Sequence, residues 1–443
     1  MNLNDTIFMF LCTLLVWLMT PGLSLFYGGL VQSKNALNTV MQSMAAIVLV
    51  TFVWITVGFT ISFGNGNLWF GNWEYTFLNH VGFATQEDIS PHIPFALFML
   101  FQMMFCTIAI SILSGSIAEK MKFIPYLLFV VIWTALVYSP VAHWVWGGGW
   151  INKLGVLDFA GGTVVHITSG VSGLVLAIMI GKGNKHSEST PHNLIITLIG
   201  GIFVWIGWYG FNVGSAFTFD KIAMLAFTNT VISASAGSIG WLILEYIFKK
   251  TTSLLGLLLG ALAGLVVITP AAGLVVITPA AGLVVITPAA GLVVITPAAG
   301  YVTYLSATIM ALIGGICCYI VINYIKVKLK YHDALDAFGI HGVGGIIGAA
   351  LTAVFQSKKA NPDIENGFIY TGDIHIILVQ ILCVTAVVIF SIVMTFIIAK
   401  VIKLITPLSV TEQETNIGLD KIVHGEHAYF EGELNRFNKH IRY

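Results

Sequence analysis

Apolar residues along this chain form blocks that are long enough to cross a membrane. A helix needs roughly 20 consecutive apolar residues to span the hydrocarbon core. Polar residues, glycine and proline separate the blocks from one another. We therefore predict an all-α integral membrane protein with about eleven transmembrane helices, near residues 7–30, 38–62, 95–118, 123–143, 160–180, 192–214, 222–248, 252–268, 302–325, 333–355 and 374–403.

The amino-acid composition agrees with a membrane protein and argues against several other classes. Hydrophobic residues make up 57% of the 443 positions, charged residues only 9%, and the mean hydropathy is +0.91. A soluble domain usually carries about 25% charged residues, because its surface faces water. Lys plus Arg equals Asp plus Glu, so no net charge favours a nucleic-acid partner. The five cysteines lie inside apolar blocks without a CxxC pair, which argues against disulfides or a zinc site.

The distribution of lysine between the blocks predicts the orientation. An odd number of spans places the two ends on opposite sides, and we expect the first block to be a retained helix, because it lacks a basic leader and a cleavage site. Alternate loops are cytoplasmic by the positive-inside rule, namely those with Lys34, Lys120, Lys122, Lys182, Lys185, Lys249, Lys250, Lys326, Lys328 and Lys330. We expect the N-terminus outside, a membrane domain over 1–409, and a cytoplasmic regulatory tail over 410–443.

Two of the spans carry the same histidine pattern. His166 and His341 each begin the motif H-x3-G-x2-G, and each follows an Asp, a Phe and a Gly, with Asp158 before the first and Asp336 before the second. The two spans lie five apart, so they cross in opposite directions. Such a pattern is typical of inverted repeats, with the functional site where they meet. We predict two inverted five-helix repeats around a central pore, followed by a final long helix.

The two histidines are candidates for the wall of that pore. Ionisable side chains at membrane depth are costly and usually functional. A single histidine could equally be a core residue bonded to a carbonyl group, but matching positions in both halves favour a pair in the pore. A metal site has less support, because no third ligand recurs in both halves.

Aromatic residues and one serine gather toward the outer ends of neighbouring spans. The predicted topology places Phe101, Phe105, Trp146, Phe211 and Ser215 there. Aromatic faces attract cations, and a hydroxyl group accepts hydrogen bonds. Each ring alone could belong to an interfacial belt or face lipid. The combination favours a site for a small cation that carries hydrogen-bond donors.

These motifs together resemble the Amt/Mep/Rh ammonium transporter family, on its bacterial Amt side. The resemblance runs from the first helix to the tail and is carried by SLFYGGL (24–30), FQMMF (101–105), AHWVWGGGW (142–150), DFAGGTVVHI (158–167), WYGFNVGSA (208–216), ITPAAGYV (295–302), DAFGIHGVGGIIG (336–348) and GLDKIVHGEHAY (418–429).

The resemblance implies roles for the outer residues. Phe101, Phe105, Trp146 and Ser215 resemble the site that recruits ammonium. Phe105 and Phe211 resemble the stacked pair that closes the pore below it. The Trp146 and Ser215 matches argue against a gas channel of the Rh type, the nearest functional alternative.

The resemblance also implies roles deeper in the pore. His166 and His341 resemble the twin histidines of the lumen, with Trp208 and Tyr27 along the path. Asp158 resembles the buried carboxylate of the family, which caps the fifth span or supports the cation electrostatically. We expect a mainly structural role with an indirect effect on transport.

The predicted function is transport of ammonium, and of methylammonium as a close analogue, across a bacterial plasma membrane. We expect the cation to lose its proton at the gate and to cross as ammonia, with proton transfer along the histidines as a linked step. Members of this family form homotrimers whose tails meet cytoplasmic PII signal proteins. An ammonium sensor that signals through its tail is an alternative. We find no nucleophile motif, HExxH or phosphate loop, and expect neither enzyme activity nor a cofactor.

Residues 264–299 depart from the family pattern. They are four identical copies of GLVVITPAA, of which three are extra. One added crossing would reverse the last three spans against the positive-inside rule, and Pro270, Pro279, Pro288 and Pro297 interrupt any long helix. We therefore predict an insertion in the outer loop between the eighth and ninth spans. It is either tolerated or impairs the pore.

Overall fold

The computed structural model describes residues 1–181, 191–271, 301–362 and 364–429. The described chain is helical and contains no extended β-sheet. Within these described ranges, eleven helical segments are long and apolar enough to cross a membrane, which confirms the predicted number. These segments are Leu3–Leu30, Ser33–Phe63, Phe95–Ile117, Phe123–Lys153, Gly162–Ile180, Leu194–Gly214, Lys221–Lys249, Leu254–Ala271, Tyr304–Leu329, Phe338–Phe355 and Ile374–Ile405.

Several segments consist of more than one helix. The α-helices are α1 (Leu3–Leu30), α2 (Ala36–Val53), α3 (Phe59–Phe63), α4 (Phe95–Ile117), α5 (Phe123–Trp133), α6 (Ser139–Val145), α7 (Trp150–Lys153), α8 (Thr168–Ile180), α9 (Leu194–Gly214), α10 (Lys221–Lys249), α11 (Leu254–Ile268), α12 (Tyr304–Ile320), α13 (Lys326–Leu329), α14 (Val343–Phe355), α15 (Phe368–Thr371), α16 (Ile374–Ile405) and α17 (Glu412–Ile417). Side chains cap the first backbone N–H groups of seven of the described helices, from Asn2, Asn193, Asp220, Ser253, Thr303, Asp373 and Thr411.

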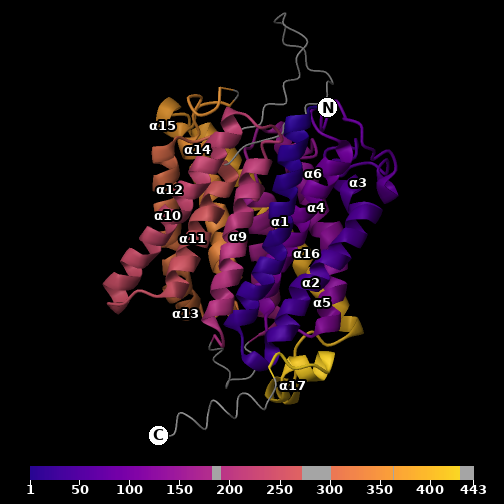
Figure 1. The fold of residues 1–443 in the computed structure, drawn as a ribbon, viewed down its shortest axis with the longest axis vertical. Helices are drawn as coiled ribbons and strands as arrows, with labels where there is room; N and C mark the ends of the chain where they lie inside the picture. Colours follow the sequence, from indigo (N-terminus) through magenta and orange to yellow (C-terminus); the bar gives the residue numbers. More distant parts are fainter. Residues whose placement is uncertain (182–190, 272–300, 363, 430–443) are drawn as a thin grey trace, which may run out of the picture.

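The long helices lie side by side along the long axis of the molecule, with the N-terminus at one end and α17 at the other (Figure 1). In the middle of the bundle, α1 and α9 pack closely in opposite chain directions. Glycines permit this approach, because a Cβ atom on Gly22, Gly29, Gly200 or Gly207 would overlap atoms of the facing helix. The first helix of one half thus packs against the first helix of the other.

Packing around the histidine motifs confirms the two inverted repeats. Gly170, four residues after the first histidine, faces backbone of the second motif, and Gly345, four residues after the second, faces the turn that carries the first histidine. Gly173 and Gly348, seven residues after them, face α4 and α11 respectively. Those helices belong to the third and eighth spans, which are again five apart. Equivalent glycines therefore meet equivalent helices in the two halves.

The repeats also share π-helical turns that the sequence did not reveal. The fifth and tenth spans begin with π-helical turns at Gly162–Ile167 and Phe338–Gly342, which contain the two motif histidines. The fourth and ninth spans have such turns at Thr134–Tyr138 and Val321–Ile325. A π-turn adds a residue to the helical repeat and is frequent at functional sites.

The first copy of the tandem repeat is part of the eighth span. Its residues Gly264–Ile268 complete α11, and Thr269 and Pro270 follow in a short 3₁₀ turn. The backbone N–H of Tyr301 donates to the carbonyl of Ala271 at 3.3 Å. Residues 271 and 301 therefore lie next to each other at the end of the eighth span. The remaining copies lie outside the described residues, so the insertion in the outer loop stays a prediction.

The described part of the tail, to residue 429, packs against loops at the end of the bundle opposite the N-terminus. Ser409 pairs with Met121 in an isolated β-bridge, and Lys122 forms a 2.8 Å ion pair with Glu414. The Asp420 carboxylate accepts hydrogen bonds from two backbone N–H groups at the start of α2, at 2.8 and 3.1 Å. Residues 430–443 of the predicted regulatory tail lie outside the described residues.

Candidate functional site

A small pocket lies among aromatic rings near the end of the bundle where the N-terminus lies. Its volume is about 10 Å³, room for about one water molecule. Three of the four expected binding residues line it, and Phe101 lies behind the wall, with its ring centroid 4.9 Å from that of Phe105. The lining residues are Phe63, Phe98, Gln102, Phe105, Trp146, Phe159, Ser215 and Phe217.

Hydrogen bonds fix the two polar residues that the sequence placed in this pocket. The Trp146 indole N–H donates to the backbone carbonyl of Asp158 at 2.7 Å, which orients the ring against Phe105. The Ser215 hydroxyl donates to the carbonyl of Phe211 at 2.8 Å. The lone pairs of the serine oxygen therefore remain available to a guest that carries N–H donors.

A pair of stacked rings separates this pocket from the interior of the bundle. Phe105 from α4 and Phe211 from α9 stack with centroids 4.0 Å apart and an angle of 14° between the ring planes. Both rings are buried. On its other side, Phe211 lies 5.9 Å from the His166 ring. The predicted gate pair thus lies directly between the pocket and the histidines.

The two motif histidines meet in the interior, as the repeat predicted. Their Nδ1 atoms are 3.1 Å apart, and both side chains are buried. A neutral imidazole has one N–H, so one ring donates through Nδ1 and exposes a bare Nε2, while the other accepts and carries Nε2–H. The Nε2 atom of His166 has no hydrogen-bond partner among the described residues. The pair therefore offers both an acceptor and a donor.

Of the two other predicted pore residues, Trp208 contacts the histidine pair and Tyr27 does not. The Trp208 ring stacks on His166 with centroids 5.2 Å apart, and its N–H donates to the Thr269 hydroxyl at 3.0 Å. Tyr27 is buried farther toward the tail end, where its hydroxyl donates to the carbonyl of Ile112 at 3.3 Å. The structure brings Trp208 to the histidines and places Tyr27 along the bundle below them.

Asp158 lies at the start of the fifth span as a helix cap. One carboxylate oxygen, Oδ2, accepts from the backbone N–H groups of Thr163 and Val164 at 2.9 and 3.1 Å. The other oxygen, Oδ1, has no partner among the described residues. Burial raises the pKa of Asp158 to about 6, although backbone N–H groups oppose the rise.

The expected equivalence of Asp158 with Asp336 is wrong. Asp333 lies eight residues before His341, as Asp158 lies eight before His166. Asp333 Oδ2 accepts from the fifth and sixth residues after it, in the manner of Asp158, whereas Asp336 forms an ion pair with Lys326. The sequence comparison matched Asp336 because a Phe and a Gly follow it closely, but the spacing to the histidine was the better guide.

Several residues at the site were not expected from the sequence. Gln102 is a buried polar residue of the pocket wall, between the two phenylalanines of the FQMMF motif. Phe217 completes that wall, and Thr269 anchors Trp208. The amide of Gln102 within an apolar span was a signal that could have found it. Within the described ranges, no three His, Cys, Asp or Glu side chains are grouped to hold a metal.

Comparison with known proteins decides the family. The model of the Ammonium Transporter Family matches residues 7–289 and 287–429. This chain belongs to that family. An ammonium transporter of Bacillus subtilis (strain 168) is 48% identical over 429 residues, which cover 97% of this chain and 99% of that protein. Among solved structures, Candida albicans Mep2 superposes with a TM-score of 0.82 at 29% identity, over 96% of this chain and 90% of that one.

Another family structure, titled "Sensor Amt Protein", has a TM-score of 0.80 at 29% identity and covers 94% of this chain and 97% of its own. The fold is thus shared by family members with different descriptions. Membership and the eleven spans make this chain a multi-pass membrane protein of a transporter family.

Proposed function

We propose that this protein transports ammonium by recruiting the cation in the aromatic pocket and passing ammonia along the twin histidines. The observation that carries the proposal is the order of the parts. A pocket for one small guest, a stacked ring pair and a buried imidazole pair follow one another along one line.

The pocket suits a small cation with N–H donors. The faces of Phe105 and Trp146 attract positive charge by about 0.5–2 kcal/mol each. The Ser215 oxygen and the Gln102 carbonyl supply acceptors. The pocket holds one water-sized molecule, so a hydrated ion does not fit. Ammonium binds by replacing its water with these groups.

The stacked pair favours removal of the proton before passage. An ion that crosses an apolar passage loses its hydration, which costs far more than the aromatic faces return. Neutral ammonia loses much less. Ammonium therefore gives up its proton at Phe105 and Phe211 and continues as ammonia, whereas potassium has no proton to give and is excluded.

The histidines then receive the ammonia molecule. Ammonia has three N–H donors and one lone pair, and the imidazole pair presents one bare nitrogen and one N–H. Ammonia and the imidazole pair can therefore satisfy each other's hydrogen bonds. The pair also links two titratable rings through one hydrogen bond, so it is a route for the released proton.

Orientation and assembly follow from the lysine distribution and the family. We propose that the N-terminus and the aromatic pocket face the outside and the tail faces the cytoplasm. We further propose a homotrimer in the plasma membrane, with the packed tail as the surface that a PII-type protein contacts. Contacts of the tail with α2 give such a partner a mechanical connection to the pore helices.

The test is ammonium-evoked charge movement in proteoliposomes, with ammonia-driven pH change recorded in parallel. We expect a saturable response to ammonium and none to potassium. His166→Leu and His341→Leu abolish the selective response, and His375→Leu, an exposed residue at the start of α16, serves as control. Unchanged rate and selectivity in both pore variants would refute the proposed pathway. A pH change without current would establish electroneutral passage instead of the linked proton route.

A further inference from the structure

A groove of about 730 Å³ opens on the side of the bundle, away from the aromatic pocket. It lies between α8 and the segment that joins the ninth and tenth spans, at the end of the molecule where α13 and α17 lie (Figure 1). Its walls are mostly apolar and include Leu174, Ile178, Ile325, Leu329, Phe338 and Val343. Ile178 and Leu329 are 60% and 67% exposed, so the groove is open to the surroundings.

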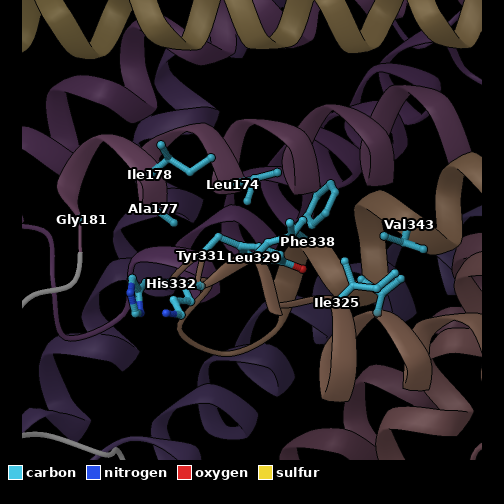
Figure 2. A pocket seen from close by; sticks show the side chains of 12 residues that line it. Leu174, Ala177, Ile178, Gly181, Ile325, Leu329, Tyr331, His332, Phe338 and Val343 are labelled. Carbon is cyan, nitrogen blue, oxygen red and sulfur yellow. The ribbon is translucent and has the colours of Figure 1, made fainter. Parts of the chain in front are cut away.

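The groove has one polar end. His332 lies there, while Ile325 and Val343 lie at the opposite end of the view (Figure 2). Lys330 also lines the groove, directly after α13, where a left-handed backbone conformation turns the chain. A cationic residue thus borders an apolar channel at the level where the spans end.

Among the described residues, most charged groups near this end of the groove lie beside an opposite charge, and Lys330 is the exception that the proposal uses. Lys326 is paired with Asp336 at 2.5 Å, and Asp333 binds two backbone N–H groups. No ion pair involves Lys330 among the described residues. Lys120 lies near the carboxylates of Asp333 and Asp336, and its ammonium group donates to the carbonyl of His332 at 3.0 Å.

We propose that this groove binds an anionic phospholipid from the leaflet on the tail side. One acyl chain lies along the apolar walls, and the phosphate group lies at Lys330 and His332. The shape and charge favour this ligand, because a soluble anion leaves the apolar walls exposed and a zwitterionic lipid brings its own cation to Lys330. Basic pockets between membrane helices on the cytoplasmic side are typical sites for anionic head groups.

The groove lies behind the turn that carries one pore histidine. Phe338 is the first residue of the π-helical turn Phe338–Gly342, which contains His341, and Val343 directly follows this turn. The Phe338 ring covers Gly342, so closely that a Cβ atom there would overlap it. An acyl chain against Phe338 and Val343 therefore supports this turn from the side opposite His166. Lipid occupancy is expected to raise the transport rate.

The first experiment measures binding and does not depend on transport. Native mass spectrometry of the full protein counts retained phosphatidylglycerol and phosphatidylcholine across a titration. The change Lys330→Gln is expected to weaken phosphatidylglycerol binding about fivefold, the effect of one lysine near an anionic surface. Lys328→Gln, the same charge change two residues away and outside the groove, is the matched control. Equal affinity for the two lipids, or equal effects of the two changes, overturns the proposal.

A second pair of variants tests the acyl chain. Leu329→Trp fills the groove and is expected to reduce lipid retention, whereas Val327→Trp does not, although both positions are 67% exposed. Soluble glycerol phosphate is the probe for the head group alone. Competition by glycerol phosphate together with no effect of Leu329→Trp identifies a simple anion site and overturns the proposal.

Discussion

Replacing Asp158 separates its role as a helix cap from its charge. Oδ2 accepts both backbone N–H groups, and Oδ1 has no partner in the described chain. In Asp158→Asn the amide oxygen can take the place of Oδ2, so the cap is retained while the charge is lost. In Asp158→Ala two buried N–H groups lose their acceptor. Each such group costs about 1–3 kcal/mol, so we expect Asn to exceed Ala in stability by about 2–6 kcal/mol.

The pH dependence gives a second measure of the same site. The rise in the pKa of Asp158 from 3.8 to about 6 corresponds to about 3 kcal/mol. The folded protein holds this proton more tightly than the unfolded chain, so the stability of the wild type falls as pH rises from about 4 to about 6. Asp158→Asn lacks this loss and is expected to be at least as stable as the wild type at pH 7.

Thermal unfolding in detergent between pH 4 and pH 8 checks both expectations. Equal unfolding temperatures for the Asn and Ala variants would show that the cap contributes nothing and would refute the reasoning. A pH profile of Asp158→Asn parallel to the wild type would refute the assignment of the pKa. Transport by the well-folded Asn variant then measures the contribution of the charge alone.

Four further changes test other parts of the molecule. Trp146→Leu is expected to raise the KM for ammonium by about 2- to 30-fold, the loss of one cation–π contact, measured as current against concentration. Gly170→Val should abolish transport and lower the unfolding temperature, because the facing backbone leaves no room for a side chain. Removal of residues 273–299 should leave the unfolding temperature and the transport rate unchanged, because Ala271 and Tyr301 are already joined by a backbone hydrogen bond. Asp420→Ala should release the tail to protease in inside-out vesicles.

The sequence alone was sufficient to predict the transmembrane spans and the two inverted halves. Length and apolarity identified all eleven spans, and the motif shared by His166 and His341 identified the inverted halves, because both signals lie within one helix. The stacking of Phe105 on Phe211 required the family resemblance, since nothing local places α4 against α9.

Other features depend on contacts between distant segments and could not be predicted. The carboxylate of Asp420 caps α2 from more than 380 residues away. The π-helical turns shift the register at both histidines, and they are defined by hydrogen bonds that no residue pattern marks. Asp333 was missed for a different reason, because matching by neighbouring residues outweighed the constant distance to His341.

The contact between the two imidazoles constrains the order of events in the pore. One proton lies between the two Nδ1 atoms, so histidines that are equivalent in the repeat differ in state at every moment. In the proposed proton route, a proton that enters at the bare Nε2 drives the shared proton to the other ring, which releases its own Nε2 proton. Both rings have then exchanged tautomers, and the entry side presents an N–H that cannot accept. On this route, both rings must return to their first tautomers before the pair can conduct a second proton in the same direction.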